Sequence, residues 1–95
     1  MKTLPFDAAQ FIDSPEAEEI LLADAFESGN TEYIAHALGI IARARGMTAV
    51  AREAGVAREA LYRALSPTGD PRLSTLLGVL KALHITITPQ RQAES

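Results

Sequence analysis

The stretch MTAVAREAGVAREALYRAL, from Met47 to Leu65, constrains the fold more than any other part of the chain. It is typical of two short helices separated by a glycine, which are the ingredients of a helix-turn-helix. Ala51 is small enough to lie where two helices cross, and Gly55 follows four residues later, where the turn needs a positive φ. The pattern therefore predicts a tightly crossed helical pair.

The second helix of this pair is expected to present a polar outer face. A recognition helix lays its N-terminal residues on base edges in the major groove, where arginine can donate two hydrogen bonds to guanine. Thr48 is expected to cap the first helix and to bind a phosphate there. A purely structural hairpin remains the alternative, because such hairpins use the same spacing. The candidate DNA-binding residues are Arg45, Thr48, Arg52, Arg58, Glu59, Tyr62 and Arg63.

Turn signals on both sides of the pair predict three further helices. Ser14-Pro15-Glu16 combines a capping side chain, a proline suited to the first helical position and an early acid, so it begins a helix that Gly29 ends. A second helix begins at Asn30 or Thr31 and ends at Gly46.

The C-terminal third of the chain contains a helix and a strand signal. Asp70 and Pro71 are expected to begin the last helix, in which Leu73 and Leu77 belong to a leucine stripe that should face the core. The segment ITIT, residues 85–88, alternates β-branched residues and predicts one short strand. Such a strand needs a neighbour to pair its backbone, which could be the N-terminal segment, the same strand of a second subunit or the sheet of a partner.

Charge is divided along the chain, although the net charge is only −3. Residues 1–32 hold eight acids and one lysine, whereas residues 43–63 hold five arginines and two glutamates. This asymmetry suggests a basic partner for the first region and an acidic partner for the second. Ordinary solvated helix faces are the alternative interpretation.

Several functions are disfavoured by composition. Cysteine is absent, and His36 and His84 lack a partner pattern, so we expect no metal site and no cofactor. No arrangement typical of an enzyme is recognisable. No apolar run reaches about 20 residues, and the N-terminus is unlike a signal peptide, so we expect a cytoplasmic protein that does not bind membranes.

The segment REALYRALSP, followed by GDPR, resembles the antidote proteins of RelE/HigB-type addiction modules, which belong to the Cro/repressor-like (Xre) helix-turn-helix class. The entrance IARARGMT and the N-terminal LPFDAAQFIDSPE are similar as well, so that the likeness covers nearly the whole chain. Ala57 departs from the pattern, which more often has serine or another capping residue at this position.

This resemblance implies an antitoxin with two binding activities. It would neutralise a cognate RelE/HigB-like, RNA-cleaving toxin by direct binding, and as a homodimer it would bind double-stranded DNA at its own promoter and repress the operon. The acidic helix would meet the basic toxin through Glu16, Glu18 and Glu19. A transcriptional regulator with no toxin partner and a protein-interaction module with a structural hairpin are the alternatives.

The fold expected from pattern and resemblance together is all-α. It is a compact five-helix bundle of the lambda-repressor-like helix-turn-helix type, with a short C-terminal strand, and forms one domain over residues 1–95. Its expected parts are an N-terminal arm (1–13), the acidic helix and second helix (14–46), the helix-turn-helix (47–65), the C-terminal helix (70–84) and the strand (85–88).

Overall fold

The computed structural model describes residues 14–89 and 91, and the expected N-terminal arm lies outside these residues. The described part of the chain contains five α-helices and no strand, which confirms the expected all-α class. The helices are α2 (Pro15–Ser28), α3 (Thr31–Arg45), α4 (Met47–Ala54), α5 (Arg58–Ala64) and α6 (Leu73–Ala82).

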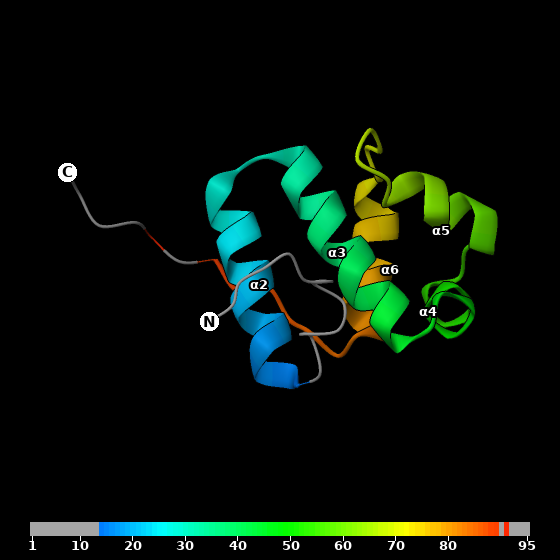
Figure 1. The fold of residues 1–95 in the computed structure, drawn as a ribbon, viewed down its shortest axis with the longest axis horizontal. Helices are drawn as coiled ribbons and strands as arrows, with labels where there is room; N and C mark the ends of the chain where they lie inside the picture. Colours follow the sequence, from blue (N-terminus) through cyan, green and yellow to red (C-terminus); the bar gives the residue numbers. More distant parts are fainter. Residues whose placement is uncertain (1–13, 90, 92–95) are drawn as a thin grey trace, which may run out of the picture.

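Helices α2 and α3 form an antiparallel hairpin (Figure 1). The Ser14 hydroxyl accepts a hydrogen bond from the Ala17 amide at 3.2 Å, as its sequence position predicts for a capping residue. Gly29 ends α2 with φ 68°, a left-handed conformation that favours glycine. The Asn30 side chain then accepts from the Tyr33 amide at 2.9 Å and starts α3. These local caps fix both ends of α2 and the start of α3.

Helices α4 and α5 are joined by the short turn that the sequence predicts. Gly55 has φ 76°, and its amide donates to the carbonyls of Ala51 and Arg52. Ala51 is buried, as expected for a residue in the crossing of two helices. Val50 and Leu61 are buried beside it and join the pair to the core.

The start of α4 differs from the prediction. Gly46 is the N-cap residue, with φ 108°, and the helix begins at Met47 without any side-chain cap. A single glycine is enough to redirect the chain from α3 into α4, so Thr48 lies inside the first turn. The prediction that Thr48 caps this helix is therefore wrong.

Helix α6 packs against α4, and a missing side chain allows the close approach. A Cβ atom on Gly78 would lie 2.9 Å from the Ala54 carbonyl oxygen. The helix begins at Leu73, with Arg72 as its N-cap in an extended conformation and without a side-chain cap. The predicted cap at Asp70 is wrong, because residues 70–72 are extended and carry the chain from α5 to α6.

Apolar residues at helical spacing do not all face the core. Leu73 and Leu77 are 68% and 53% exposed, although the spacing predicts burial. Because Gly78 packs against α4, the buried face of α6 is centred on Val79 and continues to the C-cap residue Leu83, whereas Leu73 and Leu77 turn outward. On α2, Ile20 is likewise 71% exposed.

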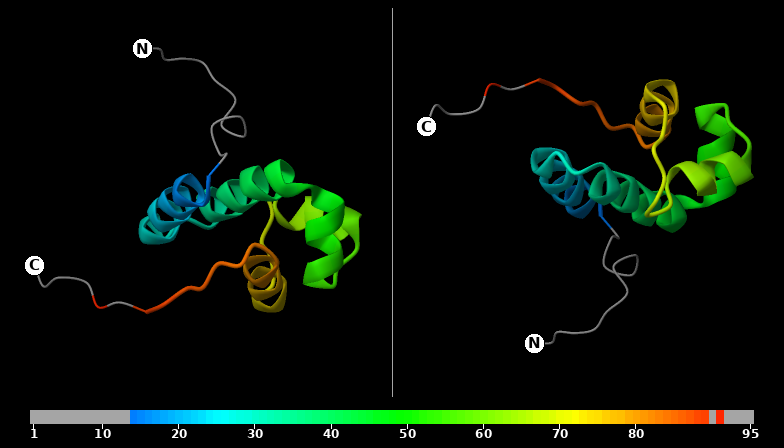
Figure 2. Two further views of the ribbon diagram at one scale, coloured as in Figure 1. Left: turned by 90° about the horizontal axis from the view of Figure 1, so that it is seen from below. Right: turned by 90° about the horizontal axis from the view of Figure 1, so that it is seen from above.

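The predicted C-terminal strand is absent from the described residues. Residues 85–88 are extended and run from α6 past the α2–α3 hairpin (Figure 2), but no second strand lies beside them. His84 adopts φ 61° at the bend after α6, and the Ile85 amide donates to the Leu80 carbonyl at 2.9 Å. The alternating sequence correctly indicates an extended backbone, but a strand also requires a neighbour.

Candidate nucleic-acid and partner interfaces

The outer face of α5 presents the polar side chains expected to contact DNA. Arg58, Glu59, Tyr62 and Arg63 are all exposed, whereas Leu61 is fully buried and anchors the helix. The polar side chains of this face are therefore available to a partner, while Leu61 packs into the core and fixes the position of α5.

Within this face, Arg58 and Tyr62 contact each other. The Arg58 Nη2 donates a 3.2 Å hydrogen bond to the Tyr62 hydroxyl, and its guanidinium carbon lies 5.0 Å from the ring centroid. The residues are four apart, so they lie on adjacent turns of one helix face. Stacking on the ring orients a guanidinium while leaving other donors free. In the described part of the chain, Glu59 forms no ion pair with either neighbouring arginine.

The N-terminal end of this face lacks a side-chain cap. Ala57 is the N-cap residue of α5, and no side chain bonds to the first amides of that helix. On α4, Thr48 and Arg52 are both exposed. Three arginines of α4 and α5 are thus exposed, namely Arg52, Arg58 and Arg63.

Arg45 and Glu18, which the sequence assigned to different partners, form an ion pair. The Arg45 Nε and Nη2 donate to the two carboxylate oxygens of Glu18 at 2.9 and 2.6 Å. The Glu18 residue is only 5% exposed, whereas the Arg45 side chain is 36% exposed. The hydrogen bond to Glu18 raises the pKa of the Arg45 guanidinium above its ordinary value. Sequence reasoning missed this pair, which joins α2 to the last turn of α3.

The remaining acids of α2 form an exposed acidic face. This face consists of four exposed residues, Glu16, Glu19, Asp24 and Glu27. Helix α2 contains no lysine or arginine. The Tyr33 hydroxyl donates to Asp24 Oδ2 at 2.6 Å, and this hydrogen bond raises the pKa of Tyr33. Two of the three predicted partner-binding acids, Glu16 and Glu19, are therefore accessible.

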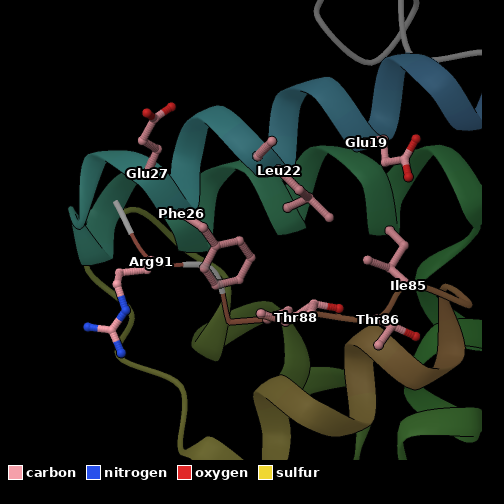
Figure 3. A pocket seen from close by; sticks show the side chains of 10 residues that line it. Glu19, Leu22, Phe26, Glu27, Ile85, Thr86, Thr88 and Arg91 are labelled. Atoms are coloured by element: carbon pink, nitrogen blue, oxygen red, sulfur yellow. The ribbon is translucent and has the colours of Figure 1, made fainter. Parts of the chain in front are cut away.

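A groove that the sequence did not reveal lies between α2 and the extended segment after α6 (Figure 3). Its volume is about 800 Å³. Phe26 projects from α2 towards the extended segment, and Ile85 lies near Glu19. We call this feature the α2 groove. Residues that line it include Glu19, Leu22, Phe26, Ile85, Thr86 and Thr88.

Two other kinds of site are absent from the described residues. No group of three or more histidine and acidic side chains is placed to hold a metal ion there. Within the same ranges, no helix is both long enough and apolar enough to span a bilayer.

The chain is similar to a known protein family and to a known protein. A family described as "Probable addiction module antidote protein" matches residues 2–91. An uncharacterised protein of Haemophilus influenzae is 44% identical over 86 residues, which covers 90% of this chain and 89% of the relative. No solved structure matches the chain.

Proposed function

The chain belongs to the family of probable addiction module antidote proteins, and from this premise we propose that it is an antitoxin with two binding partners. It acts in the cytoplasm, neutralises a RelE/HigB-like, RNA-cleaving toxin by direct binding, and represses its own operon by sequence-specific DNA binding. The family is not a family of enzymes.

DNA binding is supported by the exposed face of α5. A helix in the major groove must present donors that are not engaged inside the protein. Among the described residues, the Arg63 side chain forms no hydrogen bond or ion pair, and Arg58 uses one donor on the Tyr62 hydroxyl and keeps its others available. Arg52 and Thr48 on α4 are exposed and available to the DNA backbone. Arg45 is a weaker candidate, because its guanidinium is held by Glu18.

The operator-binding form is proposed to be a homodimer. A single copy offers one recognition helix and three exposed arginines on α4 and α5, which is little for a specific complex. Two copies can bind half-sites about 34 Å apart, one helical turn of DNA. The exposed Leu73 and Leu77 leave apolar surface available for such an association.

Operator binding is tested with a fluorescently labelled fragment of the chain's own promoter. Arg63→Ala should weaken binding by at least about fivefold, the lower end of the effect of losing one base contact. Arg91→Ala is the matched control, because Arg91 is exposed and lines the groove between α2 and the C-terminal segment, to which no residue of α5 contributes. Equal affinity of the Arg63 variant and the wild type, with both folded, would refute the placement of the DNA on this face.

The neutralising activity is tested by co-expression with the protein encoded by the adjacent reading frame. The proposal expects that protein to arrest growth alone and to co-purify with this chain when both are made. A regulator without a toxin partner would bind the promoter but neither co-purify nor restore growth. A purely structural interaction module would show no salt-dependent affinity for DNA.

A further inference from the structure

The α2 groove suggests where, and in what conformation, a toxin segment binds. Resting on the proposed antitoxin function, we propose that this groove receives an extended segment of the toxin that alternates basic and apolar residues. The segment lies between α2 and residues 85–88 and pairs with the backbone of this extended stretch.

The first argument is the free backbone on one wall of the groove. The Ile85 amide is bonded to Leu80, but among the described residues no hydrogen bond engages the backbone of residues 86–88. Thr86, Ile87 and Thr88 are exposed and already extended. An extended partner can therefore add beside them with little rearrangement, as in complexes formed by β-strand addition.

The second argument is the apolar floor. Leu22 is buried at the base of the groove, and the Phe26 ring and Ile85 are half-buried along it (Figure 3). Ile87 adds further exposed apolar surface next to the groove residue Thr86. Alternate side chains of an extended segment point to the same side, so every second residue of the partner can pack on this floor.

The third argument is charge. Glu19 and Glu27 line the groove, while Glu16 and Asp24 extend the acidic face of α2 beyond it. Arg91 is the one cation among the lining residues in the described ranges. Because acids predominate along α2, the intervening side chains of the partner are expected to be lysine or arginine.

These arguments also separate the acids of α2 by role. Glu18 is buried and held by Arg45, so it is a structural residue and not a contact for the toxin. Glu19 lies in the groove itself and is expected to contribute more to toxin binding than Glu16, which is not among the lining residues.

The experiment measures the affinity of the full chain for the purified protein of the adjacent reading frame. Ala23→Arg places a long cation at an exposed position on the groove wall, and Glu19→Arg reverses a charge on it. Each should weaken binding at least tenfold. The matched controls are Ala49→Arg and Glu53→Arg, which make the same changes at exposed positions of α4 and should stay within twofold of the wild type.

Hydrogen exchange of the same complex tests the conformation of the bound segment. The amides of residues 86–88 should exchange rapidly in the free chain and become protected on binding. Unchanged affinity in both groove variants, or no protection of these amides in a complex of normal affinity, would overturn the inference while leaving the antitoxin function intact. Failure of the wild-type chain to bind or neutralise the neighbour's product would instead refute the antitoxin function.

Two further measurements would reveal a different occupant of the α2 groove. A loss of dimer mass in Ala23→Arg would show that the groove holds a second copy of the chain. Protection of residues 86–88 in the free chain that disappears when residues 1–13 are deleted would show that the chain's own N-terminal segment occupies the groove. Either result would contradict the inference.

Discussion

Removing the Arg45 side chain should destabilise the fold through the acid that it leaves behind. The Glu18 carboxylate lies almost entirely out of solvent and receives both of its hydrogen bonds from this guanidinium. In Arg45→Met the long aliphatic part of the side chain is kept, whereas the charge and the donors are lost. The carboxylate must then either stay unpaired or open a path to water.

The magnitude follows from the burial of the two partners. Breaking a fully buried ion pair costs about 3–5 kcal/mol, whereas an exposed pair contributes about 0–1 kcal/mol. One third of the Arg45 side chain is exposed, so solvent screens the pair and reaches the site once the guanidinium is gone. We therefore expect a loss of about 2 kcal/mol in the free energy of unfolding, or roughly 8–16 °C in Tm for a domain of this size.

Urea unfolding followed by circular dichroism measures this loss. Glu16→Gln is the control, because it removes an exposed acid of the same helix and should change the free energy of unfolding by less than about 0.5 kcal/mol. The double variant Arg45→Met with Glu18→Leu should recover much of the stability, since no buried charge remains. If Arg45→Met were as stable as Glu16→Gln, the ion pair would have no structural role.

Two further predictions concern Tyr33 and Gly78. Because Tyr33 donates to Asp24, its pKa should exceed 10.0 when titrated by absorbance in a Tyr62→Phe background, and Asp24→Ala should lower it. The raised pKa means that the stability from this bond is complete below the unfolded pKa and is lost as the pH rises through the folded pKa. Gly78→Ala should lower the free energy of unfolding by about 1–3 kcal/mol, because the added methyl group overpacks against the Ala54 carbonyl. Alanine favours an isolated helix over glycine, so urea unfolding shows which of the two effects prevails.

The features that sequence predicted best are those decided within a few residues. Ser14, Gly29 and Gly55 end or begin helices as expected, because capping and positive φ depend on local chemistry. Thr48 and Asp70 have the right chemistry for caps but are not used, because Gly46 and the extended residues 70–72 set the helix starts. A capping residue thus marks a possible start, and the path of the chain decides whether it is used.

Features that depend on distant residues were not predictable in the same way. The spacing of Leu73 and Leu77 shows that they share a face of α6, but the packing of Gly78 on α4 decides which face is buried. The pairing of Glu18 with Arg45 joins residues 27 positions apart. The α2 groove combines α2 with residues 85–88, and no local pattern links these segments.

The acidic helix α2 and the arginine-bearing helix α5, which are separate in the sequence, are also separate in the structure. Helix α2 and the C-terminal segment lie on one side of the molecule, and α5 lies on the other (Figure 1). Within the part of the chain that the structure describes, one ion pair joins the two charge groups, that of Glu18 with Arg45. It neutralises a charge from each and leaves the exposed acids on α2 and the exposed arginines on α4 and α5. A toxin segment in the α2 groove would therefore leave the proposed recognition face of α5 uncovered, so one copy of the chain can hold both partners at once.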